Sequence, residues 1–469
     1  MTELHELDAL AMAQAIINGE VSPTELVEHH LDRIAAYGDR LGAFVTVTAD
    51  EARQAAKIAE EQHAEGIAAA SPLFGVPTAI KDLAPTAGVR TTFGSRAFAD
   101  WVPDVDANAV TLIKRAGMIS LGKTNTPEWG LSAYSDNGVA AGVRTPWDLT
   151  RSAGGSSGGA AAAVAAGLIP IAHGSDGGGS LRIPASACGV FGFKPTRGRV
   201  SSGPLGVDVT GLSVQGPIAW TVADAAAMLD ALATPMPGDP YWAPPLEKGD
   251  TFLAAARTDP GQLRIACFSD AGFPVDPDVH AAYQDTAALL EDLGHDIEEI
   301  DYPFGDELVD HFNVLWAAQA LGMPVPPAAE PLLQPMTQWW RERARRQTGE
   351  QVYNALVGMQ LGARRALERL APFDALLCPT LALPPQPIDY FRSPDDQAEE
   401  AQRQHAFTPF TAGFNITGQP AASLPLGVSA TGLPLGVMLA GRPAGDAALL
   451  SLCAQVEAAR PWRDRRPAL

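Results

Sequence analysis

AGGSSGGAAAAVAAG, residues 153–167, and HGSDGGGSLRIPAS, residues 173–186, are two glycine-rich blocks joined by the short apolar run LIPIA. Glycine adopts positive φ without a Cβ penalty and lets a backbone approach a ligand closely. Both blocks place a serine beside bare backbone amides, and in the second block these amides can turn inward as a nest that suits an oxyanion. The amides are those of Gly177, Gly178, Gly179 and Ser180. Taken alone, the block is equally well interpreted as a plain glycine turn.

Short β-branched runs alternate with helical patterns on both sides of these blocks. GVPTAI at 75–80 and GMISLG at 117–122 are bounded by glycine and proline turns, as strands are. Further strands are predicted within 262–268 and 373–383, and two strands around a glycine turn within 422–441. This alternation predicts an α/β layered fold.

The chain is expected to form one domain over residues 1–469 in three parts. Ser22 begins a capping box that opens a helix with proline at its first position, and residues 1–65 read as mainly helical. The glycine-rich core covers about 70–220, and a second α/β part covers about 262–469. The Pro-, Asp- and Gly-rich stretch 234–262 reads as a surface loop between them.

Composition excludes several classes of function. The formal charge of −21, from 33 Lys+Arg against 54 Asp+Glu, disfavours nucleic-acid binding. Four widely spaced cysteines without a CxxC pair indicate buried thiols rather than disulfides or a zinc site, so no metal is expected. The N-terminus lacks a signal-peptide pattern and the longest apolar run, 160–172, is too short for a bilayer. We therefore expect a cytoplasmic protein without a membrane partner.

Three short motif matches have a better structural interpretation. GMISLGKT at 117–124 fits the phosphate-loop pattern, but its middle residues read as a strand and Pro127 interrupts any helix after it. SLGK at 120–123 with SDN at 135–137 mimics β-lactamase elements, yet the KTG element is absent. GSSGG at 155–159 fits a nucleophile elbow centred on Ser157, and this alternative stays open because later histidines exist, although in no motif.

The sequence resembles the amidase signature family in several segments. The two glycine blocks match its serine-rich motifs, and they are followed by GFKPTRGRVS at 192–201 and preceded by GVPTAIKDL at 75–83. The resemblance continues to NITGQPAASLP at 415–425 and GLPLGVMLAGR at 432–442, so it covers most of the chain. DGGGSLRIPAS is most similar to bacterial acylamidases and cyclic nylon-oligomer hydrolases. The resemblance implies a large mixed β-sheet with helices on both faces.

The resemblance also implies a catalytic set without a histidine or a cofactor. Ser180 is the expected acyl-enzyme nucleophile, Ser156 the bridging serine that follows a cis peptide, and Lys81 the base. A serine hydroxyl is a poor nucleophile at neutral pH, and a lysine must be desolvated to act as a base. Because Lys81 ends an apolar strand, such desolvation is expected there.

Residues beside this set are expected to support it. Asp176 and Arg182 flank the nucleophile and should hold its loop, while Ser157 and Ser175 are expected to lie next to the relay. The family has threonine where Ser175 stands and serine where Ala160 stands, and neither difference removes a reacting atom. His173 is expected to pack rather than react.

The expected function is hydrolysis of a small-molecule carboxamide to an acid and ammonia or an amine. The alternative is the glutamine-hydrolysing A subunit of an aminoacyl-tRNA amidotransferase, which requires partner proteins. The idiosyncratic region 300–370 argues against that alternative. Trp339 and Trp340 either line an aromatic pocket or pack a helix, with packing favoured. A homodimer is compatible with the sequence, which does not identify the amide.

Overall fold

An eight-stranded mixed sheet forms the centre of the computed structural model, which describes residues 3–66, 71–305, 307–393 and 395–469. Its strand order is β4-β6-β5-β10-β11-β9-β7-β8, and only the pairs β7–β8 and β7–β9 are parallel. The strands are β4 Ile171–Asp176, β5 Phe191–Lys194, β6 Val214–Ala219, β7 Arg264–Cys267, β8 Asp296–Glu299, β9 Ala375–Pro379, β10 Ala421–Val428 and β11 Pro434–Gly441. The sheet thus joins strands of the central and C-terminal parts, as a single domain requires, and the division into three parts stays a prediction.

A second sheet of three strands carries Lys81 at the end of one strand. It consists of β1 (Phe44–Val47), β3 (Ile119–Thr124) and β2 (Pro77–Lys81), with β3 in the middle. Strand β1 lies inside the region expected to be mainly helical, because it pairs with β3 far along the chain. The residues that match the phosphate-loop pattern form strand β3, so the structural interpretation of that match is confirmed.

Helices cover both faces of the large sheet, as predicted. Alternate residues of β9 and β11 face different sides: Leu377 and Leu439 join the larger apolar cluster, whereas Leu376 and Met438 join the smaller one. The larger cluster includes side chains of α7 (Val222–Leu232), α9 (Pro277–Asp292) and α15 (Asp446–Ala459). The smaller includes those of α10 (Glu307–Gly322), α12 (Gly349–Leu370) and α14 (Gly413–Thr417).

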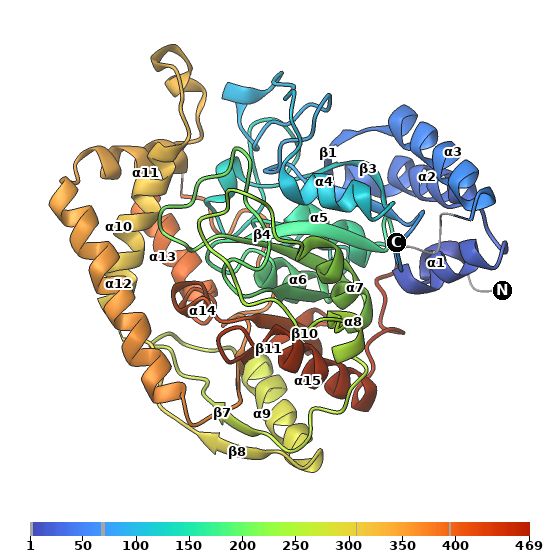
Figure 1. The fold of residues 1–469 in the computed structure, drawn as a ribbon. Coiled ribbons are helices and arrows are strands. Elements are labelled where there is room, and N and C mark those ends of the chain that lie inside the picture. Colours follow the sequence, from blue (N-terminus) through green and yellow to red (C-terminus); the bar gives the residue numbers. More distant parts are fainter. Residues whose placement is uncertain (1–2, 67–70, 306, 394) are drawn as a thin grey trace.

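The remaining helices complete the two ends of the molecule and its centre. At one end lie α1 (Ala9–Ile17), α2 (Pro23–Leu41) and α3 (Ala49–Ala64), and at the other end α10 and α12 lie with α11 (Pro335–Arg345) and α13 (Gln397–Phe407) (Figure 1). Helices α5 (Gly158–Ala165) and α6 (Arg182–Cys188) follow the two serine-bearing segments. The other helices are α4 Asn108–Arg115 and α8 Phe252–Ala255.

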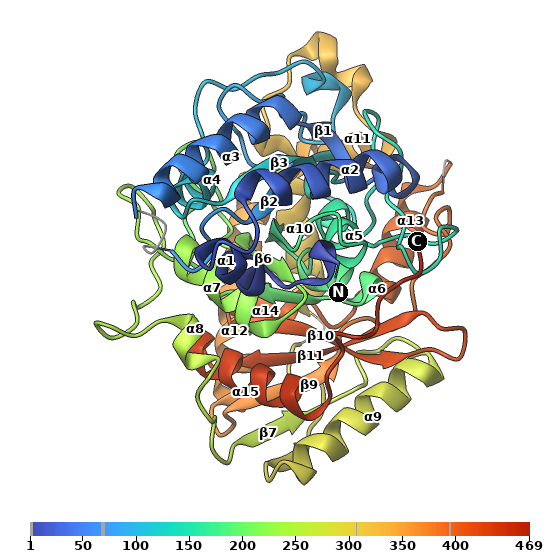
Figure 2. The ribbon, with the colours of Figure 1, turned by 90° about the vertical axis from the view of Figure 1, so that its right-hand side faces the viewer.

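Local sequence signals explain several of these boundaries. Ser22 accepts a hydrogen bond from the Glu25 amide and closes the predicted capping box at the start of α2. The stretch 234–262 is a connection as predicted, except for the single turn of α8. Helices α9 and α15 both pack against strand β11 on the face seen in Figure 2. No helix within the described ranges has the length and apolar character needed to cross a membrane.

Candidate active site

Lys81 is the last residue of β2, and its ammonium group is fully buried. Its Nζ lies 2.7 Å from Ser156 Oγ, 2.9 Å from Ser175 Oγ and 3.3 Å from the Ser175 carbonyl oxygen. Strand β2 runs beside β4, where the Thr78 hydroxyl donates to the Ile171 carbonyl at 2.9 Å. This side-by-side packing of two distant strands brings the lysine to both serines.

Burial changes the proton affinity of this lysine. Desolvation lowers the pKa of Lys81 from its ordinary value of 10.5 to about 7, although the nearby Asp176 carboxylate opposes the shift. Near neutral pH a large share of the Lys81 side chain is therefore an uncharged amine. An uncharged amine has a lone pair that accepts a proton from the Ser156 hydroxyl, so the pair has the chemistry of a general base.

The segment from Gly155 to Ser157 lies in the first glycine-rich block and is hydrogen-bonded to the second. The Gly155–Ser156 peptide bond is cis, which confirms that prediction. The Ser157 amide donates to the Ser180 carbonyl at 3.2 Å, and the Ser157 hydroxyl donates to the Ser175 carbonyl at 3.1 Å. Because the Ser157 side chain is fully buried and already bonded, a nucleophile elbow centred on it has no support in the structure.

Ser180 lines a cavity. The residue is 6% exposed, and the cavity has a volume of about 400 Å³. Within the described residues its hydroxyl makes no hydrogen bond, so the contact between the Ser180 and Ser156 hydroxyls that a relay requires is not formed. Catalytic hydrogen bonds in unliganded enzymes are often long or poorly aligned and tighten when substrate binds.

The oxyanion nest predicted from the sequence is smaller in the structure. The Gly179 amide donates to Asp176 Oδ1 at 2.7 Å, so it is not available to a substrate oxygen. Among the described residues no acceptor contacts the amides of Gly177, Gly178 and Ser180, which leaves three donors beside the candidate nucleophile. The glycine-rich loop thus uses one amide for its own support, and the other three have no acceptor among the described residues.

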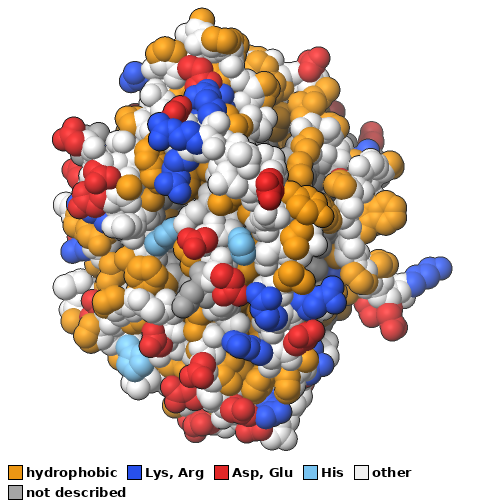
Figure 3. All heavy atoms as spheres, turned by 90° about the vertical axis from the view of Figure 1, so that its left-hand side faces the viewer, with side chains coloured by type: hydrophobic (Ala, Val, Ile, Leu, Met, Phe, Trp, Pro, Cys, Tyr) orange, Lys and Arg blue, Asp and Glu red, His pale blue; other side chains and the backbone are white. Residues whose placement is uncertain are grey.

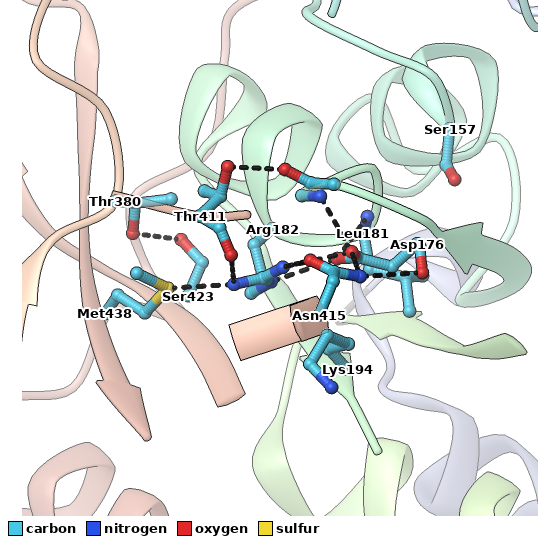
Figure 4. A network of polar contacts seen from close by, with 12 residues as sticks. Ser157, Asp176, Leu181, Arg182, Lys194, Thr380, Thr411, Asn415, Ser423 and Met438 are labelled. Carbon is cyan, nitrogen blue, oxygen red and sulfur yellow. Dashed lines mark hydrogen bonds and ion pairs between the residues drawn. The ribbon is translucent and has the colours of Figure 1, made fainter. Parts of the chain in front are cut away.

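Asp176 and Arg182 form a buried ion pair (Figure 4). Arg182 Nε lies 3.0 Å from Asp176 Oδ2, and Arg182 Nη2 lies 3.0 Å from Oδ1. Burial alone raises the pKa of Asp176, but Arg182 more than compensates and holds that pKa well below its ordinary value. The carboxylate also accepts the Leu181 amide at 3.1 Å, so the pair fixes the loop on both sides of Ser180.

Two further residues of this network were missed by the sequence reasoning. Asn415 in α14 accepts from Arg182 at 2.7 Å and donates to Asp176 Oδ1 at 2.8 Å. The Thr411 carbonyl accepts from Arg182 at 2.8 Å, and the Thr411 hydroxyl donates to the Gly178 carbonyl at 2.6 Å. Asn415 begins the NITGQP segment that carries the resemblance, which was the available signal, whereas nothing in the sequence singled out Thr411.

His173, Trp339 and Trp340 have different surroundings. His173 is buried with its Nε2 2.8 Å from Gln215 Oε1, and desolvation lowers its pKa to about 4. It is therefore packed and uncharged at neutral pH. Trp340 packs in a small cluster with Met336 and also lines the cavity, whereas Trp339 only packs beside it.

Comparisons with known proteins identify the family of this chain. A family model described as Amidase matches residues 25–450. An acylamidase of Rhodococcus erythropolis is 36% identical over 487 residues, which cover 100% of this chain and 99% of that protein. The solved structure of a 6-aminohexanoate cyclic dimer hydrolase superposes with a TM-score of 0.91 and 32% identity, covering 100% of this chain and 99% of that one.

In sequence, the match to the amidotransferase alternative is less complete. The A subunit of the glutamyl-tRNA(Gln) amidotransferase of Desulforapulum autotrophicum is 39% identical over 326 residues, which cover 68% of this chain and 65% of that protein. The family match, by contrast, spans nearly the whole chain and both sheets. The chain therefore belongs to the amidase signature family, whose members hydrolyse carbon–nitrogen bonds of amides.

Proposed function

We propose that this protein hydrolyses the C–N bond of a small-molecule carboxamide through an acyl-enzyme on Ser180. The observation that carries the proposal is the buried hydrogen bond of 2.7 Å between Lys81 and Ser156, whose neighbour Ser157 is hydrogen-bonded to the cavity-lining Ser180. A neutral lysine in that position is able to take up the proton that leaves the nucleophile. The relatives named as an acylamidase and a cyclic dimer hydrolase support an amide substrate.

In the proposed acylation, the Ser180 hydroxyl attacks the carboxamide carbon while its proton passes to Ser156 and the Ser156 proton passes to Lys81. The amides of Gly177 and Gly178, with that of Ser180, donate to the oxyanion that forms. The relay then returns a proton to the departing nitrogen, and the C–N bond breaks to leave an ester on Ser180. Water attacks this ester by the same base catalysis and releases the acid.

The experiment that tests this proposal is labelling with a fluorophosphonate, followed by intact mass, peptide mapping and assay of an amide panel on the purified single chain. One adduct on Ser180 together with amide turnover is the expected result. An adduct on Ser157 would instead favour the nucleophile elbow. The absence of both labelling and turnover would refute a self-sufficient hydrolase.

The same purified chain also distinguishes a self-sufficient hydrolase from a partner-dependent glutaminase. Release of ammonia from glutamine only after partner proteins are added would favour that alternative. Turnover of a simple amide by the lone chain is expected instead, because in sequence the acylamidase matches 100% of this chain and the amidotransferase subunit 68%.

A further inference from the structure

The cavity beside Ser180 has no acidic or basic residue among the described residues that line it, apart from one histidine. Its wall consists mainly of apolar and aromatic side chains from α10, α13 and α14 and from the loops before them. Burial lowers the pKa of that histidine, His405, so it is uncharged at neutral pH. Charged side chains do occur on the surface of the molecule that carries α10–α12 (Figure 3). The described cavity lining therefore differs from the surrounding surface in having none.

Several polar side chains of the lining are already bonded within the protein. The Gln404 side chain accepts from the Ala133 amide at 2.8 Å, and the Thr408 hydroxyl donates to the Gln404 carbonyl at 2.9 Å. Asn313 on α10 differs, because its Oδ1 is buried without a partner among the described residues. Among the described lining residues, a bound molecule thus meets neutral polar groups and no side chain that would pair with a charge.

A stacked aromatic pair on α10 lies directly against the glycine loop. The Phe312 and Trp316 rings are one helical turn apart, with centroids 5.0 Å apart and planes 19° apart. A Cβ placed on Gly178 would lie 3.2 Å from Phe312, and one placed on Gly177 would lie 3.3 Å from the Trp316 ring. The Trp316 Nε1 donates to the Leu131 carbonyl at 3.1 Å, which fixes that ring.

We propose that this pocket selects amides that are uncharged and apolar around the scissile bond, and that Phe312 and Trp316 are the residues that set this preference. The inference rests on the proposed function and names its substrate class. A carbonyl that reaches the amides of Gly177 and Gly178 brings its neighbouring groups against the two rings. An unpaired charge buried there is unfavourable, and removing a partner from a buried charge typically costs a factor of roughly 100 or more.

The test compares three amides of equal chain length: hexanamide, 6-aminohexanamide with a terminal ammonium, and adipic acid monoamide with a terminal carboxylate. We expect kcat/KM for hexanamide to exceed that for either charged amide by roughly 100-fold. Charged amides turned over within about threefold of hexanamide would overturn the inference while leaving amide hydrolysis intact. If no amide is hydrolysed, the proposed function fails, and calorimetric titration of the same three ligands still decides the preference.

Variants connect the preference to the aromatic pair. Phe312→Ala and Trp316→Ala should lower the hexanamide preference at least tenfold, mainly through KM, whereas Tyr353→Ala on the exposed side of α12 should not change it. Asn313→Asp is nearly isosteric and adds a carboxylate to the wall, so it should make 6-aminohexanamide about tenfold better as a substrate relative to hexanamide. Unchanged ratios in the folded ring variants and in Asn313→Asp would overturn the assignment.

Discussion

The rate of amide hydrolysis should depend on pH through the buried Lys81 amine. Its pKa is lowered by desolvation to about 7, so the neutral fraction is about one half at pH 7. That fraction falls to about one tenth at pH 6 and rises to about nine tenths at pH 8. With the ordinary pKa of 10.5 only about 0.03% would be neutral at pH 7, so burial enriches the base about 1,500-fold.

The assay is kcat/KM for a neutral amide between pH 5.5 and 9. We expect an acid limb with a midpoint near 7 and a loss of about tenfold between pH 8 and pH 6. Lys81→Ala should abolish most amide hydrolysis, spare ester hydrolysis more because an alkoxide leaves with less protonation, and remove the limb from the residual activity.

Lys194 provides a matched control, since burial also lowers its pKa to about 7. Its Nζ donates to the Pro195 carbonyl rather than to either serine. Lys194→Met should therefore keep the acid limb even if the rate falls. A limb that survives in Lys81→Ala, or that disappears only in Lys194→Met, would refute the role of Lys81 as the base.

Three further outcomes follow from the same geometry. Ser156→Ala should lower kcat for amides by about 100-fold or more in steady-state assays, and an unchanged rate would point to direct transfer from Ser180 to Lys81. Asp176→Asn should lower the free energy of unfolding by about 3–5 kcal/mol in urea titrations, because Arg182 would stay buried without its partner, and a change below about 1 kcal/mol would contradict that reasoning. Lys81→Met should raise the melting temperature at pH 7. The folded-state pKa of Lys81 lies below the unfolded one, so burial of this amine lowers the stability of the wild type. The loss of stability is complete below pH 7 and disappears as pH rises toward 10.5. The gain should therefore shrink when the melt is repeated near pH 10, and a gain independent of pH would exclude this cause.

Local patterns were sufficient for much of the fold. The capping box at Ser22 and the β-branched runs at 75–80 and 117–122 predicted elements that the structure contains, because caps and apolar strands are encoded within a few residues. Strand β1 was not predicted, since four residues at 44–47 become a strand only by pairing with β3. The cytoplasmic location and a homodimer stay predictions.

The sequence by itself determined which residue types are available for chemistry. They are a lysine at the end of an apolar strand, two serines in glycine-rich blocks, and an aspartate and an arginine that flank the second serine. Only the tertiary structure decided that the Gly179 amide supports the loop while no described residue accepts from the three neighbouring amides, and that Phe312 and Trp316 lie against Gly177 and Gly178. The physical reason is sequence separation. Backbone turns and caps depend on neighbouring residues, whereas a wall supplied by α10 depends on how that helix packs more than a hundred residues away from Ser180.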